Sequence, residues 1–568
     1  MRGSGWLALL LGTVVAAPAQ AQDSATARLQ ALAERFWTWR AATQPASGDD
    51  IPRIERPAGW TPDWSPPAMA PRRETLHELE RDWRGIDTTG WSRPAQVDYR
   101  LLGSAIARVH WELDIVRGWR RNPMFYLDQT LSVLHDDLLR APPFDPPRTS
   151  AMVHRLERVP RTLAEGEANL TEAVGPFAQL AVDALDGIGP RLDSVSRALT
   201  PLLQGPDAAR FGPAAAAAAP AFQAYRAWLS RRLPSLPRAT AVGRDAYVGF
   251  LRRVALVPLS PEELVAMARQ DWSRAVAFET YERQRNTGLP ELALFPTLAD
   301  QLAREAADET RIRAYLEQKG ILTVPDWLRH YRTAPVPPYL APLSDWGVDD
   351  DLTSATRLAE DGTSYRPPPS PALGYFYLAS AKDPRPLMVH EGVPGHYMQL
   401  ALSWANQDPI RRHYYDSNSN EGIGFYAEEM MLQAGLFDDN PRAREIIYNF
   451  MRLRALRVEV DVKLATGEFT IPEAAKYLET TVPMDAHTAL GEAASFAAGP
   501  GQAITYEIGK LQILAFLTDA RLRQGDRFSL RAFHDFVWKN GNVPIALQRW
   551  EMLGLDDEMR ALGDATGR

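Results

Sequence analysis

The chain of 568 residues contains no cysteine. This absence excludes disulfide bonds, thiol nucleophiles and thiolate metal ligands together, so any bound metal ion must be held by His, Asp or Glu side chains. The net charge of −8 provides no positive surplus, which argues against nucleic-acid binding. The sequence also lacks a Gly-x-Ser-x-Gly elbow, a Walker loop and a Gly-x-Gly-x-x-Gly segment after a strand, which disfavours serine hydrolases and common nucleotide-binding proteins.

Long apolar runs are also scarce, and the clearest one lies at the N-terminus. Arg2 precedes an apolar run from Trp6 to Ala17, and the small-residue pattern Ala-Gln-Ala follows at 19–21. This arrangement is typical of a secretory signal peptide cleaved after Ala21. A membrane anchor is the alternative, disfavoured because the run is short for a bilayer span and no cysteine is available for lipid attachment. We expect a periplasmic or secreted chain of charge −8 − 1 = −9, with no membrane span after signal removal.

The residues that are abundant indicate a large helical protein. Hydrophobic residues make up 45% of the chain, including 16 tryptophans, and they recur at spacings of three and four. Ser260 and Thr470 each stand three residues before a glutamate, with a proline one and two residues after them respectively, as capping residues at helix starts do. The sequence predicts a mainly α fold with a signal peptide at 1–21, an N-terminal helical lobe at 22–255 and a second helical lobe at 256–568. A strand is expected at 372–380 (ALGYFYLAS).

The chemistry is expected in the segment "HEGVPGH", which contains His390, Glu391 and His396. Zinc peptidases carry His-Glu-x-x-His on one helical face, but here the histidines are six apart and would point about 120° away from each other in a regular helix. The intervening residues 392–395 are Gly-Val-Pro-Gly, which disfavour helix. A local break there would return both imidazoles to one side. Neutral imidazoles are good zinc ligands, and the adjacent glutamate could accept a proton from water.

Four segments together resemble a bacterial family called domain of unknown function 885, which is grouped with glutamate-ligand zinc metallopeptidases. They are HEGVPGHYMQ, NEGIGFYAEEMM, PGQAITYEIGKLQI and FHDFVWKNGNVPI, in the family's order, and the resemblance extends from about Tyr247 to Leu547. It implies one Zn2+ ion held by His390, His396 and Glu421, with Glu391 as general base. Glu428 is implied as a hydrogen-bond partner of a ligand histidine or, alternatively, as the third ligand itself.

The same resemblance implies roles at the substrate. Tyr506 would donate to the oxyanion formed at a peptide carbonyl, Gln502 would bind the substrate backbone, and His534 would line the cleft. Two departures from the family pattern occur. Ile423 replaces a tryptophan, and residues 461–465 read Asp-Val-Lys-Leu-Ala where relatives carry a histidine. The first should alter a pocket wall, and the second puts subsite preference in doubt.

For the fold and function, the resemblance implies a two-lobed helical, zincin-like metallopeptidase with a deep cleft and a small β element beside the site. The expected activity is hydrolysis of peptide bonds in short peptides. The alternative is a non-catalytic or weakly catalytic peptide-binding protein on the same fold. Peptide preference, exo- or endo-cleavage, oligomeric state and the physiological metal are left open.

Two further patterns are interpreted as structural. The segment "RLRALRVEVDVK" at 452–463 predicts a packed helix with arginines extending to the surface. "HELER", which begins at His77, has an arginine where a second histidine would be needed and predicts a solvated helix face. The remaining histidines are expected to be surface or core residues: His77, His110, His135, His154, His330, His413 and His487.

Overall fold

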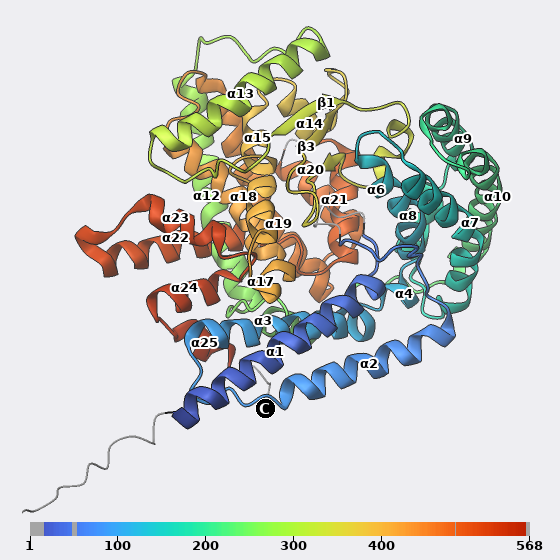
Figure 1. Ribbon diagram of the computed structural model, residues 1–568. Helices are drawn as coiled ribbons and strands as arrows, with labels where there is room; N and C mark the ends of the chain where they lie inside the picture. Colours follow the sequence, from blue (N-terminus) through green and yellow to red (C-terminus); the bar gives the residue numbers. More distant parts are fainter. Residues whose placement is uncertain (1–15, 48–53, 483, 564–568) are drawn as a thin grey trace, which may run out of the picture.

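The computed structural model describes residues 16–47, 54–482 and 484–563, which form a mainly helical protein with one small sheet (Figure 1). The α-helices are α1 (Ala16–Thr43), α2 (Pro66–Arg84), α3 (Arg93–His110), α4 (Gly118–Arg121), α5 (Met124–Leu127), α6 (Val133–Leu139), α7 (Pro146–Asn169), α8 (Gly175–Ala184), α9 (Ile188–Leu199), α10 (Ala208–Arg232), α11 (Arg244–Arg253), α12 (Pro261–Arg285), α13 (Leu298–Gln318), α14 (Tyr375–Ser380), α15 (Arg385–Glu391), α16 (His396–Trp404), α17 (Pro409–His413), α18 (Ser417–Gln433), α19 (Pro441–Thr466), α20 (Ile471–Thr481), α21 (Ala486–Ala498), α22 (Thr505–Gln524), α23 (Leu530–Lys539), α24 (Ile545–Leu553) and α25 (Asp557–Leu562). Short π-helical segments are η1 (Trp111–Val116) and η2 (Asp128–Ser132), and 3-10 segments are η3 (Thr200–Leu202), η4 (Leu233–Ser235), η5 (Ala341–Trp346) and η6 (Gly525–Arg527). The strands are β1 (Tyr331–Pro335), β2 (Asp350–Asp351) and β3 (Gly362–Arg366).

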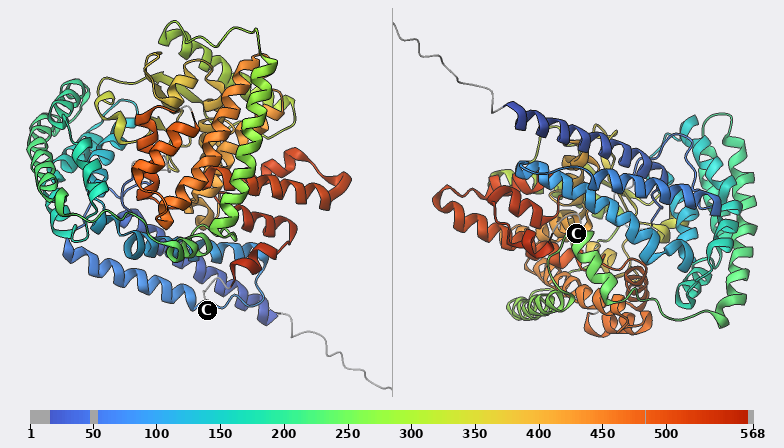
Figure 2. Two further views of the ribbon diagram at one scale, coloured as in Figure 1. Left: turned by 180° about the vertical axis from the view of Figure 1, so that it is seen from behind. Right: turned by 90° about the horizontal axis from the view of Figure 1, so that it is seen from below.

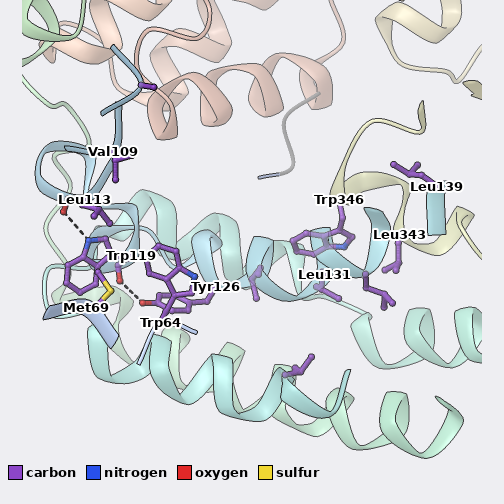
Figure 3. Packing of buried hydrophobic residues seen from close by; sticks show 14 of the residues in the cluster. Trp64, Met69, Val109, Leu113, Trp119, Tyr126, Leu131, Leu139, Leu343 and Trp346 are labelled. Atoms are coloured by element: carbon purple, nitrogen blue, oxygen red, sulfur yellow. Dashed lines mark hydrogen bonds between the residues drawn. The ribbon is translucent and has the colours of Figure 1, made fainter. Parts of the chain in front are cut away.

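The N-terminal helices build their own hydrophobic core along one side of the molecule. Helices α7, α9 and α10 follow the outer edge, and α1 and α2 run along the base (Figure 1). Within this core the Trp119 indole donates to the Leu113 carbonyl at 3.1 Å, and the Tyr126 hydroxyl donates to the Trp119 carbonyl at 2.7 Å (Figure 3). Trp346, from a much later segment, is buried in the same cluster. This hydrophobic core therefore includes residues beyond position 255, the predicted boundary between the two lobes.

The second half of the chain is built around α18, α19 and α22. Helix α12 packs lengthwise against α19, as the view from behind shows (Figure 2). The predicted capping boxes are confirmed at the starts of α12 and α20. The side chains of Ser260 and Thr470 each accept a hydrogen bond from the backbone N–H of the glutamate three residues on, and the side chain of that glutamate accepts one from the backbone N–H of the capping residue. Most of the predicted signal peptide, residues 1–15, lies outside the described residues. Within the described ranges, no helix is both long and apolar enough to cross a bilayer.

The predicted strand at 372–380 is wrong, because the segment contains helix α14. A short aromatic run has no clear period, and here tertiary contacts select the helix: Tyr375 bonds Asn449 and packs against Phe450 on α19. The sheet instead uses polar segments in the order β1-β3-β2, with β1 parallel and β2 antiparallel to β3. Tyr331 of β1 stacks on Tyr397 of α16, with ring centroids 5.2 Å apart. A small β element therefore does lie against the predicted site.

Helices α18 and α22 cross at a point where neither helix has a side chain. A Cβ added at Gly509 would lie 2.1 Å from the Asn418 carbonyl oxygen and 2.6 Å from the Gly422 Cα atom. Gly422 directly follows Glu421, and Gly509 is three residues beyond Tyr506. This close approach therefore sets how far Glu421 lies from Tyr506.

We predict that Gly509→Ala lowers the free energy of unfolding by about 1–3 kcal/mol, because the added methyl group must separate the two backbones. Gly491→Ala is the matched control, since a Cβ at this exposed position of α21 meets nothing within 4 Å. That substitution should instead stabilise the protein by about 0.5–1 kcal/mol, because alanine favours helix. Urea unfolding measures both changes, and equal stabilities for the two variants would contradict the prediction.

Candidate functional site

The backbone between His390 and His396 breaks as its composition predicts. Helix α15 ends at Glu391, and α16 begins at His396. A Cβ at Gly395 would lie 1.6 Å from the His390 carbonyl oxygen, so the chain can fold back on itself here only with glycine. The Trp538 indole donates to the Pro394 carbonyl at 2.6 Å and fixes the loop from outside. The break brings the two imidazole rings together, with centroids 4.7 Å apart and planes at 81°.

A carboxylate of α18 completes the cluster. Glu421 Oε2 lies 3.2 Å from Nε2 of His396 and 3.4 Å from Nε2 of His390. One turn on, a Cβ at Gly424 would lie within 3.0 Å of the Cε1 atoms of both rings, so the missing side chain makes room for the imidazoles. Glu391 approaches from the other side, with Oε2 4.0 Å from His396 Nε2, and potential ligand atoms of His390, Glu391 and His396 all lie within 4.8 Å of one another.

Glu428 contacts the opposite edge of His390. Its Oε1 lies 2.7 Å from Nδ1, and because a carboxylate accepts hydrogen bonds, Nδ1 carries the proton and Nε2 keeps its lone pair toward Glu421. Burial, together with the Arg454 guanidinium, lowers the pKa of His390 to about 3, so the imidazole is neutral at physiological pH. Of the two predicted alternatives for Glu428, the geometry favours the hydrogen-bond partner over the third ligand.

Two arginines of α19 were missed as site residues. The prediction that this helix extends its arginines to the surface is wrong for Arg454 and Arg457, which are only 2% and 4% exposed. Arg454 Nη2 lies 2.9 Å from Glu428 Oε1, and Arg457 donates to Glu492 at 2.7 Å while its guanidinium lies 4.4 Å from the Tyr506 ring centroid. Their three-residue spacing places them on one helical face, which was the available sequence signal. The residues that these two arginines contact could not be predicted from the sequence, because they lie on other helices.

The remaining predicted residues take three different environments. The Tyr506 ring lies in the first turn of α22, with its centroid 6.2 Å from that of His390 and nearly parallel to it. Gln502 Oε1 accepts from the Ser417 hydroxyl at 2.9 Å beside a cavity. His534 is buried and is not among the residues that line this cavity: its nitrogens contact the Tyr426 hydroxyl at 2.9 Å and the Ile321 carbonyl at 2.8 Å.

The cavity has a volume of about 1160 Å³ and lies between α1 and α3 on one side and α18, α21 and α22 on the other. Trp37 and Arg40 line it from α1, and Ser417, Gln502 and Thr505 line it from the site side. Among the described residues, its wall thus reaches one turn short of Glu421 and stops directly beside Tyr506. The cavity wall therefore includes sequence neighbours of Glu421 and Tyr506, whereas the lining does not contain His390, Glu391, His396, Glu421 or Tyr506 themselves.

The fold and the site define a class: a mainly helical protein with a buried His–Glu cluster between α15, α16 and α18. A model of the family of bacterial proteins of unknown function called DUF885 matches residues 47–552, and the chain belongs to this family. A comparison with curated proteins gives no match.

Solved structures share the fold. A suspected lipoprotein of unknown function from Shewanella oneidensis superposes with a TM-score of 0.68 at 16% identity, covering 94% of this chain and 99% of that one. A suspected lipoprotein from Colwellia psychrerythraea gives a TM-score of 0.73 at 17% identity, with the same coverage. At such identities the likeness concerns the fold alone.

We predict that Arg454→Met lowers the free energy of unfolding by about 3–5 kcal/mol, because it leaves the Glu428 carboxyl buried without its cation. Adding Glu428→Gln should restore part of this loss. Arg35→Met is the control, since its pair with Asp82 is more than half solvent-exposed on the arginine side and should contribute less than about 1 kcal/mol. Urea unfolding in the presence of a chelator gives the values, and similar losses for Arg454→Met and Arg35→Met would refute this account.

Proposed function

We propose that the protein is an exported zinc-dependent peptidase that hydrolyses short peptides on a zincin-like helical fold. The observation that supports it best is that Glu421 Oε2 lies 3.4 Å from His390 Nε2 and 3.2 Å from His396 Nε2. Two imidazoles and one carboxylate, with a further position left to water, form a common ligand set of zinc hydrolases. A zinc ion held there would lower the pKa of a bound water to about 7 and polarise a substrate carbonyl.

The donor set fits such an ion in charge and in space. Glu428 fixes His390 in the tautomer that presents Nε2, as second-layer carboxylates do for ligand histidines. Gly424 leaves the space that both rings occupy, which any other residue would fill. The absence of thiols is no obstacle, because imidazole and carboxylate suffice for zinc.

Two side chains of the protein would then transfer protons and stabilise the negative charge during the reaction. Glu391 is adjacent to the ligands but its side chain is 16% exposed, so it can accept a proton from an attacking water and return it to the leaving amine. The ring of Tyr506 lies 6.2 Å from that of His390, and its hydroxyl would donate to the oxygen that becomes negative as the carbonyl is attacked. Arg457, lying 4.4 Å from the Tyr506 ring centroid, would hold the phenol in place.

The size of the cavity favours short peptides over folded proteins as ligands. A volume of about 1160 Å³ accommodates a few residues, and both apolar and charged groups line it. The second candidate function, peptide binding without turnover, uses the same cavity. The presence of Glu391 beside the histidine pair favours hydrolysis over binding alone.

We predict that Glu391→Gln abolishes hydrolysis of a mixed short-peptide library while zinc content stays at the wild-type level, because glutamine cannot accept the proton. Product analysis by mass spectrometry and metal analysis of the same samples test this. The exposed Glu291→Gln variant is the control and should keep full activity. Turnover by the Glu391→Gln variant, or by wild type after complete zinc removal, would overturn the assignment. Peptide retention by zinc-loaded wild type without cleavage would support the binding-protein alternative.

We predict that Tyr506→Phe lowers kcat about 10²–10³-fold with little change in KM, because the lost hydroxyl contacts the transition state more strongly than the substrate. The control is Tyr281→Phe, at a tyrosine that is 63% exposed. Steady-state kinetics on the best peptide found above provide both constants. A kcat within twofold of wild type would exclude Tyr506 as the donor.

A further inference from the structure

A second cluster of metal-ligating side chains lies on α2 and α3, at the base of the molecule (Figure 1). His77 and Glu80 are three residues apart on one face of α2, and His110 is the last residue of α3. One potential ligand atom from each lies within 4.8 Å of the other two, and His110 Nε2 is 3.3 Å from Glu80 Oε2. The rings of His77 and His110 have centroids 5.5 Å apart.

Neighbouring side chains orient these ligand atoms. His110 lies between two carboxylates, with Nδ1 3.1 Å from Asp114 Oδ2 and Nε2 3.3 Å from Glu80 Oε2. In the tautomer that donates Nδ1–H to Asp114, Nε2 is free to bind a metal ion beside Glu80. This hydrogen bond lowers the pKa of Asp114. Arg73 in turn lies 2.7 Å from Asp114 Oδ1. A histidine that donates its second nitrogen to a carboxylate is the usual arrangement around a bound metal ion.

Glu80 is oriented in the same way. Arg84 donates to its Oε1 through two nitrogens, at 2.8 and 3.1 Å, and this leaves Oε2 on the side of His110. The side chains of Glu80 and His110 are each 25% exposed, and His77 is exposed, so an ion can enter from solution. None of these residues belongs to a buried hydrophobic cluster, and none lines the large cavity or the site around His390.

We propose that His77, Glu80 and His110 bind a second divalent transition-metal ion, of which zinc is the representative, with water completing the coordination. Two imidazoles and one carboxylate suit this class of ion and not calcium or magnesium, which prefer oxygen ligands alone. The ion joins α2 to the C-terminal end of α3 and so stiffens the base of the N-terminal helices. The proposal shares no residue with the proposed peptidase site and does not depend on it.

Zinc stoichiometry tests the proposal on the full chain without a polyhistidine tag. Metal-free wild type, His77→Ala, His110→Ala and the control His487→Ala are dialysed against the same buffered free zinc, and bound zinc is measured by elemental analysis. His487 is exposed and belongs to no such cluster among the described residues. We expect both cluster variants to bind one equivalent less than wild type and the control to bind the same amount.

A second readout separates this site from the one around His390. Zinc should raise the melting temperature of wild type more than that of His77→Ala, and peptide hydrolysis should be unchanged in both cluster variants. Equal zinc content in wild type, His77→Ala and His110→Ala would overturn the proposal. The test does not depend on the proposed peptidase site. It compares the zinc bound by each variant with the zinc bound by wild type, and this difference is one equivalent whether wild type binds one ion or two.

Discussion

The candidate site depends on three glycines at which the backbone approaches its neighbours more closely than a side chain would allow. At Gly395 the chain lies against the His390 carbonyl, at Gly424 helix α18 lies against both imidazoles, and at Gly509 it lies against α22. Each contact fixes a different distance. The contact at Gly395 fixes the distance between the two histidines, the one at Gly424 fixes their distance from α18, and the one at Gly509 fixes the distance between α18 and the helix that carries Tyr506. Because closely packed interiors tolerate little displacement, these three contacts determine the geometry of the whole cluster.

Electrostatics then decides the state of the groups held there. Burial disfavours every charge, yet the region contains carboxylates and guanidiniums that are almost completely enclosed. The ion pairs of Arg454 with Glu428 and Arg457 with Glu492 make this burial tolerable, and burial next to a cation keeps His390 neutral. Removing one partner is therefore more costly than removing both, since a lone buried charge remains. The same network that stabilises the helices also presents the lone pair of His390.

The features that could be predicted from the sequence are those that depend only on residues close together in the chain. The capping boxes at Ser260 and Thr470 and the helix break after Glu391 follow from local backbone preferences, and the structure has them. The strand at 372–380 failed because an aromatic run of that length fits either period, and contacts with α19 decided it. The environments of Arg454 and His534 are set by residues far away in the sequence, which no local pattern reports.

The two His-Glu segments of this chain show why such a pattern cannot define a site alone. At His77 the helix stays regular, so its useful neighbour is Glu80 and the second imidazole must come from α3. At His390 the helix breaks, the second imidazole comes from the same segment, and the carboxylate comes from α18. Neither segment forms its cluster within one helix, so helix packing completes both proposed ligand sets. Their burial then separates them, because the cluster at His390 is enclosed, where charges and dipoles act strongly, whereas the cluster at His77 faces water, which screens them.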